Sequence, residues 1–305
     1  MRALVIGASG QVGAALLTTL RARGHEARGT YGHHATPGLE PLDLTDHAAV
    51  ARAVAAARPD WVFCPAGLSH VDYCEDHVDE ALAANRDGPG AAARAAEAAG
   101  SGFVFYSSDY VFDGVAGPFG EDDTPRPRSI YGRSKHEGEQ AVMIACRRAV
   151  VIRTSVVYGP ERQEKNFVYQ LIRASREGKG FRPAADQRAS PSYNPDVAAA
   201  SVELCERGLA GLWHVAGPEV LDRYAFALLI SKEFGLDASR LTAVTTAALG
   251  QKAARPLDGG LKVANAQAQL KTGLRSPAEG LHAMREFLER GRRGRVHVDQ
   301  PRNLK

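Results

Sequence analysis

The first 23 residues constrain the fold of this chain more than any other stretch. An apolar run, Arg2–Ile6, leads directly into GASGQVG (7–13), and an alanine- and leucine-rich helical pattern follows to about Arg23. Glycines let a backbone approach a pyrophosphate closely, and a helix N-terminus offers it free N–H groups. A strand, this turn and a helix in that order therefore predict a dinucleotide-binding site. The alternative is an ordinary connection between a strand and a helix.

Strands and helices continue to alternate along the first half of the chain. Asp46 is expected to cap a helix that runs to about Arg58. This alternation predicts an α/β fold, a doubly wound, Rossmann-like parallel sheet with helices on both faces. Its ligands would lie at the C-terminal ends of the strands. The expected strands are 26–31, 61–64, 103–106, 149–153 and 212–215, and a long helical region covers about 76–99.

The composition loosens after residue 158. We expect residues 1–158 to form a dinucleotide-binding domain and residues 159–290 a smaller α/β substrate-binding part, which can return a strand to the main sheet. Residues 178–192 are rich in glycine, proline and charge and predict a loop. The arginine-rich stretch 291–305 is interpreted as a solvated basic tail. Helices of the second part are expected at about 165–177, 195–206, 224–234 and 277–289.

Composition argues against several kinds of partner. The net charge of +3 over 305 residues is too small to indicate nucleic-acid binding. No apolar run approaches the roughly 20 residues that span a membrane, and the N-terminus does not resemble a signal peptide. The four cysteines show neither metal-ligand spacing nor a disulfide framework. We therefore expect a cytoplasmic protein with reduced thiols, no metal, and neither nucleic acid nor membrane as a partner.

Tyr131 and Lys135 are the candidate proton-transfer pair. Their four-residue spacing places both side chains on one face of a helix. A neighbouring ammonium favours the phenolate and lowers the pKa of the phenol toward neutral pH. Ser108, after the apolar run 103–105, is expected to bind a reacting carbonyl group. The alternative for such a pair is a solvated helix face.

The end of the second strand bears on the cofactor. An acidic residue there binds the ribose 2′-hydroxyl in NAD-specific sites. This chain has Thr30-Tyr31-Gly32-His33-His34 instead. A 2′-phosphate would not be repelled, and His33 is a candidate to lie near it, although the two histidines also fit an exposed loop. The sequence favours NADP(H), with NAD(H) as the second candidate.

Taken together, these stretches resemble the extended short-chain dehydrogenase/reductase family and, within it, the dTDP-4-dehydrorhamnose reductase group of nucleotide-sugar reductases. The resemblance covers most of the chain, in matching order and spacing. The matching stretches are GASGQVG (7–13), LDLTD (42–46), VDYCE (71–75), YSSDYVFDG (106–114), YGRSKHEGE (131–139), RTSVVYG (153–159), KNFV (165–168), DQRASPS (186–192), WHVAG (213–217) and Arg255-Pro256.

The resemblance implies a carbohydrate-biosynthesis oxidoreductase that uses NADP(H) to reduce a keto group on a nucleotide-linked deoxysugar. It assigns catalysis to Ser108, Tyr131 and Lys135, of which the last two would also contact the cofactor. The implied cofactor-binding residues are Gly7, Ser9, Gly10, Gln11, Val12, Gly13, Asp43, Leu44, Ala66 and Gly67. The implied substrate-binding residues are Ser69, Asp109, Tyr110, Val156 and Asn166.

Two positions depart from the family pattern. RTSWVYG is typical of the group, but this chain has Val156, so the indole expected against the sugar ring is missing. Asn-Ala-Ala is replaced by Cys64-Pro65-Ala66, which leaves cofactor binding through the backbone intact. The sugar and the oligomeric state stay open, and a homodimer is one option.

Two other functions share this resemblance. One is a regulatory subunit without turnover, like the NADP-binding subunit of methionine adenosyltransferase; the complete Ser108, Tyr131 and Lys135 set argues against it. The other is a nucleotide-sugar epimerase or dehydratase. Dehydratases usually have an acidic pair after the catalytic hydroxyl, whereas Asp109-Tyr110 stands here.

Overall fold

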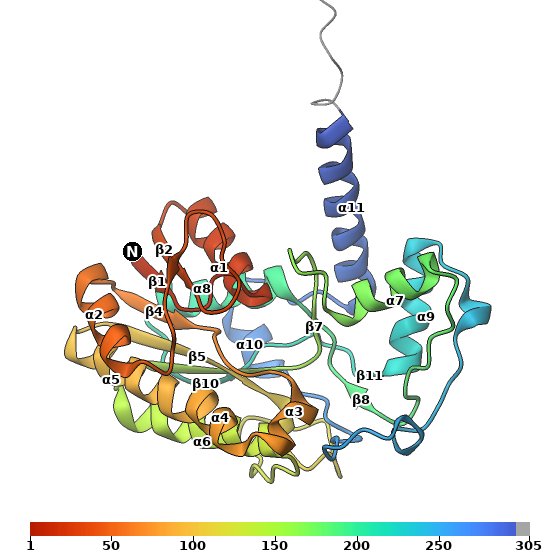
Figure 1. Ribbon diagram of the computed structural model, residues 1–305, viewed down its shortest axis with the longest axis horizontal. Coiled ribbons are helices and arrows are strands. Elements are labelled where there is room, and N and C mark those ends of the chain that lie inside the picture. Colours follow the sequence, from red (N-terminus) through yellow and green to blue (C-terminus); the bar gives the residue numbers. More distant parts are fainter. Residues whose placement is uncertain (297–305) are drawn as a thin grey trace, which may run out of the picture.

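A seven-stranded parallel sheet forms the centre of the molecule (Figure 1). The computed structural model describes residues 1–296 of the chain. The strands lie in the order β10-β6-β5-β4-β1-β2-β3, which confirms the predicted doubly wound α/β fold. Their bounds are β1 Arg2–Val5, β2 Glu26–Tyr31, β3 Glu40–Pro41, β4 Trp61–Cys64, β5 Gly102–Ser108, β6 Ala149–Thr154 and β10 Gly211–His214.

Alternate residues of each central strand enter two separate cores, because successive side chains of a strand point to opposite faces. Ala3 and Val5 pack with α1 (Gln11–Ala22) and α8 (Asn194–Glu206). Leu4 and Ile6 pack in the core on the other face. That face is covered by α2 (His47–Ala57), α5 (Gly88–Ala98) and α6 (Ile130–Ala145). The strand order reverses beside β1, where β2 follows on one side and β4 on the other, and ligands of such sheets bind at this reversal.

The second part of the chain forms a smaller lobe and also completes the main sheet. β10 pairs in parallel with β6, and Trp213 lies in the main core. The lobe has its own core around Tyr158 and Phe226. It contains β7 (Val157–Tyr158), α7 (Phe167–Arg176), β8 (Arg188–Ala189), β9 (Ser192–Tyr193), β11 (Leu221–Asp222), α9 (Arg223–Phe234), α10 (Ala264–Gln269) and α11 (Pro277–Val296).

The structure differs from the sequence predictions in three places. The long helix expected at 76–99 is divided into α3 (Val71–Asp76), α4 (Val78–Leu82), a π-helical turn (Ala83–Asp87) and α5. Residues 178–192, predicted as loop, contain part of two small β-ladders, β8 with β11 and β9 with β7. α11 continues to Val296, beyond its predicted end, and projects from the body of the molecule (Figure 1). The rest of the predicted tail, 297–305, lies outside the described residues.

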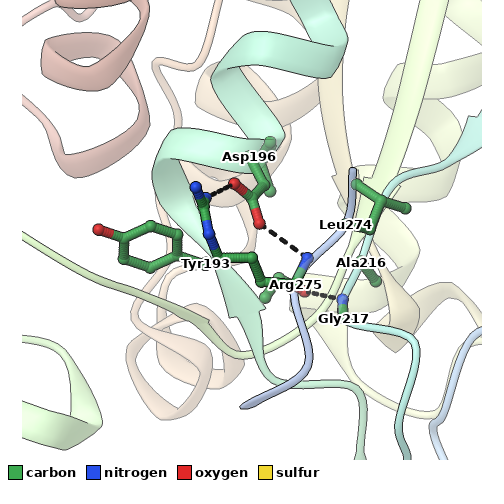
Figure 2. Close-up of a pocket in the computed structure, with 8 residues that line it drawn as sticks. Tyr193, Asp196, Ala216, Gly217, Leu274 and Arg275 are labelled. Atoms are coloured by element: carbon green, nitrogen blue, oxygen red, sulfur yellow. Dashed lines mark hydrogen bonds and ion pairs between the residues drawn. The ribbon is translucent and has the colours of Figure 1, made fainter. Parts of the chain in front are cut away.

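An ion pair joins α8 to the segment that precedes α11 (Figure 2). Asp196 pairs with the guanidinium of Arg275 and also accepts a hydrogen bond of 2.9 Å from its backbone N–H. The guanidinium of Arg275 lies 5.4 Å from the centre of the Tyr193 ring. The ion pair thus connects a helix that covers the sheet to the segment that leads into α11.

Candidate active site

The glycine turn at 7–13 lies between β1 and α1, where the strand order reverses. Gly7 has a φ of +89°, and a Cβ there would come within 2.8 Å of the Ala66 side chain. A Cβ on Gly13 would lie 2.3 Å from the carbonyl oxygen of Gly7. These contacts explain why glycine occupies both positions.

The turn also fits an anionic group. No side chain caps the N-terminus of α1, whose N-cap is Gly10, so its first N–H groups are free of a side-chain acceptor. The side-chain nitrogen of Gln11 is buried without a partner among the described residues. Ser9, Val12, Ala66 and Gly67 belong to the same strand-end region. The structure therefore supplies the backbone cradle that a dinucleotide requires.

His33 and Asp43 lie close together beyond the second strand, and the charge of His33 contributes to a lowered pKa of Asp43. The larger influences on this pKa are hydrogen bonds from the backbone and hydroxyl of Thr45, each 2.8 Å long. The Asp43 carboxylate is thus bound within its own turn. Leu44 packs in the core, so only its backbone is available to an adenine.

A cleft of about 240 Å³ opens beside the C-terminal ends of β5 and β6. Six of the predicted site residues line it together: Ser69, Ser108, Asp109, Tyr110, Tyr131 and Val156. Arg223, which was not predicted, belongs to the same lining. Proton donor, hydroxyl and substrate-side residues, predicted from separate stretches of sequence, therefore share one space.

The Tyr131 phenol is a proton donor at neutral pH. Burial raises its pKa above 10, the Ser108 hydroxyl opposes this, and the charge of Asp109 adds to it. The Ser108 hydroxyl donates to Asp109 at 2.9 Å. Burial also raises the pKa of Asp109, to about 6, against hydrogen bonds from Ser155 and Ser108. The expected lowering of the Tyr131 pKa by Lys135 is not seen in the protein alone, and the protonated phenol suits a reduction.

Two glycines let α6 approach its neighbours closely enough to place Tyr131. A Cβ on Gly132 would lie 2.1 Å from the carbonyl oxygen of Tyr110, and one on Gly138 would lie 2.1 Å from that of Asn85. Ser129 caps the helix by accepting from the Gly132 N–H at 3.1 Å. The sequence YGRSKHEGE therefore encodes both the reactive pair and its packing.

Asn85 is a positioning residue that the sequence predictions missed. It lies in the π-helical turn and is fully buried. Its amide accepts from the Leu68 N–H at 2.9 Å and donates to the Leu68 carbonyl at 2.9 Å and to Ser134 at 3.0 Å. It thereby links the strand end at Gly67 to the helix of Tyr131. π-Helical turns often mark functional sites, and an asparagine inside an apolar helical pattern was the available signal.

Lys135 is buried, with its ammonium 4.2 Å from the centre of the Phe105 ring. Burial lowers its pKa to about 8, and the negative charge of Glu139 opposes that effect. Glu139, one turn further along α6, accepts two hydrogen bonds from Arg153 on β6, at 2.8 and 2.7 Å. This buried pair fixes the helix that carries the reactive side chains.

Two of the predicted substrate-binding residues, Val156 and Asn166, lie in different surroundings. Val156 lines the cleft with a φ of +42°, which is rare for a β-branched residue and typical of functional sites. Asn166 does not line the cleft. Its side chain caps α7 by accepting from Val168 at 3.1 Å and donates to the Gly159 carbonyl at 2.9 Å, so its role toward a substrate stays a prediction.

The described residues contain no candidate metal site, disulfide or membrane-spanning helix. Residues 1–296 contain no group of three or more histidine, cysteine or acidic side chains that is arranged to hold a metal ion. All four cysteines are buried and free. None of the described helices is long and apolar enough to cross a membrane.

Fold and site together define a class. A doubly wound sheet, a glycine turn at its reversal point, and a Ser, Tyr and Lys set at the strand ends define a protein of the short-chain dehydrogenase/reductase type. The chain belongs to the RmlD substrate binding domain family, whose model matches residues 1–289. The family resemblance predicted from the sequence is confirmed.

Named relatives include sugar reductases. A probable low-salt glycan biosynthesis reductase of Haloferax volcanii is 34% identical over 88% of this chain and 92% of its own length. A methionine adenosyltransferase 2 subunit beta of Danio rerio is 31% identical over 86% of this chain and 82% of its own length. The structure of a dTDP-4-dehydrorhamnose reductase from Bacillus anthracis, in complex with NADP, has a TM-score of 0.86 and 29% identity, covering 94% of this chain and 99% of that one.

Proposed function

We propose that this protein is an NADP(H)-dependent reductase of a keto group on a nucleotide-linked deoxysugar. The observation that carries the proposal is the single cleft in which Tyr131, Ser108 and Asp109 meet, next to a glycine turn suited to a dinucleotide. Family relatives that are named as sugar reductases, and the NADP in a related structure, support it.

The chain's own residues perform the acid chemistry. Residues 7–13 would hold NADPH, which would supply a hydride when bound. Tyr131, kept protonated by burial, donates its proton to the carbonyl oxygen, and Ser108 orients that oxygen. Lys135 places a positive charge beside the strand end at Gly67, where it would bind the nicotinamide ribose. General acid help of this kind is worth roughly 10²–10⁴ in rate.

The test is a substrate panel. The protein is incubated with NADPH and a set of nucleotide-linked 4-keto sugars, and loss of reduced-cofactor absorbance is followed. Turnover of at least one member supports the proposal. Absence of turnover across the panel, with NADPH still bound, would favour the regulatory-subunit alternative. That alternative is less well supported at present, because a purely binding role has no use for the reactive side chains in the cleft.

The homodimer and the cytoplasmic location stay predictions. Light scattering of the purified chain measures the first, and fractionation of cells that produce it measures the second. Neither result alters the chemistry proposed for the cleft.

A further inference from the structure

Arg223 lies at the wall of the cleft, beside a cluster of packed aromatic rings. It is the first residue of α9 and lines the same space as Tyr131. Its guanidinium lies 5.5 Å from the centre of the Phe167 ring. That ring packs against Phe226 and Phe181, with centres 5.8 and 5.4 Å apart. A guanidinium beside a packed aromatic ring is attracted to the ring face and keeps its N–H donors available to other partners.

The guanidinium of Arg223 makes no polar contact with the described residues. Within residues 1–296 it forms no hydrogen bond or ion pair, although its backbone N–H donates to Gln187 at 3.2 Å. The closest acid on the cleft lining is Asp109. Its oxygens are occupied by the hydroxyls of Ser108, at 2.9 Å, and Ser155, at 2.5 Å. The arginine therefore has its charge near Asp109 and its donors unbound.

The half-buried Arg223 leaves its guanidinium donors available to a ligand in the cleft. It carries five N–H donors in a planar fork that matches phosphate or carboxylate oxygens. It cannot lose its proton at any physiological pH. Among the described residues that line this cleft, Arg223 is the only basic one. The chemistry that fits Arg223 is that of an oxyanion.

We infer that Arg223 binds an anionic group of the substrate in the cleft of Tyr131 and thereby selects anionic sugar derivatives over uncharged ones. The inference rests on the proposed function, in which that group is the diphosphate attached to the sugar. A carboxylate on the sugar ring offers the same chemistry. Position 223 would then be a specificity residue that the sequence predictions did not identify.

Binding tests the inference without turnover. The protein is saturated with NADP⁺ to fill the cofactor site and titrated with dTDP by calorimetry. Arg223→Met keeps a side chain of similar length on Phe167 but removes the charge. Arg176→Met, at an exposed position of α7, is the matched control. We expect Arg223→Met to weaken dTDP binding roughly 10- to 100-fold and the control to change it less than about twofold.

Two further titrations make the result specific. Thymidine, which lacks phosphate, should bind wild type and Arg223→Met equally. Glucuronate tests whether the anion is a carboxylate on the sugar ring. If wild type binds glucuronate more tightly than Arg223→Met does, while both proteins bind dTDP weakly, the inference holds with a ring carboxylate as the anion. If Arg223→Met fails to fold, as judged by NADP⁺ affinity, Arg223→Lys replaces it and should bind the anion several-fold more weakly than wild type.

Equal affinity of wild type and Arg223→Met for both dTDP and glucuronate would overturn the inference, as would binding of neither by wild type. Failure of the proposed function gives a different result, namely no NADPH turnover with the 4-keto sugar panel despite anion binding that depends on Arg223. Failure of the inference alone leaves turnover of the panel intact in Arg223→Met.

Discussion

Replacing Glu139 with glutamine is expected to destabilise the protein by about 3 kcal/mol at neutral pH. Burial alone would raise the pKa of this carboxyl, but hydrogen bonds from Arg153 and His136 outweigh it and lower the pKa from 4.5 to about 2. Each tenfold change in proton affinity corresponds to about 1.4 kcal/mol. The side chains of Glu139 and Arg153 are only 7% and 3% exposed. Breaking such a buried pair costs about 3–5 kcal/mol, in agreement with this magnitude.

Urea denaturation measures the effect, with Glu137→Gln as the control. Glu137 lies two residues earlier on α6 and bonds to Arg133 at 2.7 Å and Arg86 at 3.0 Å, but its side chain is 24% exposed. Its loss should cost less than about 1 kcal/mol. Equal losses for the two variants would refute the reasoning.

The pH dependence of the Glu139 effect has a definite sign. Because the folded pKa is lowered, the stabilisation is complete above the unfolded value near 4.5 and is lost as the pH falls through about 2. The difference between wild type and Glu139→Gln should therefore shrink to roughly half by pH 3. A difference that is constant from pH 7 to pH 3 would show that the carboxylate charge is not its source.

Three further predictions concern cofactor, pH and substrate. NADPH should bind more tightly than NADH in a fluorescence titration, because no acid follows the second strand and Asp43 is bound to Thr45; a clear NADH preference would contradict this. The rate of reduction with NADPH should fall as the pH rises through about 8, where Lys135 loses its proton. In Glu139→Gln this fall should occur at lower pH, because the negative charge that raises the Lys135 pKa is gone. Val156→Trp should improve use of dTDP-4-dehydrorhamnose roughly three- to tenfold by restoring stacking, and a wild-type specificity constant near ~10⁶ M⁻¹s⁻¹ on that sugar would contradict the reasoning.

The parts of the fold that sequence patterns predicted well are those with local signals. The strand, glycine turn and helix at 2–22 follow from residue type alone, and Asp46 caps α2 as predicted, accepting from Ala49 at 2.9 Å. The π-helical turn at 83–87 offers only Asn85 as a local signal. It depends on the tertiary contact of Asn85 with Leu68 and Ser134, residues distant in the sequence.

The residues of the site also differ in whether the sequence alone could reveal them. Ser108, Tyr131 and Lys135 could be proposed from spacing and resemblance. Arg223 could not, because its significance comes from what it does not contact and from the ring of Phe167 beneath it. The expectation that Lys135 acts on the Tyr131 pKa considered one neighbour only, whereas burial and Asp109 determine it in the folded protein.

The measurement that tests the central claim most directly is the comparison of Tyr131→Phe with wild type on a 4-keto sugar that the wild type reduces. The ring stays, so its edge contact with Tyr110, at 5.5 Å between centres, is kept. NADPH affinity should stay within a few-fold, while kcat falls by ~10² or more because the proton donor is lost. Near-full activity of Tyr131→Phe would contradict the account, since the proton would then come from another group.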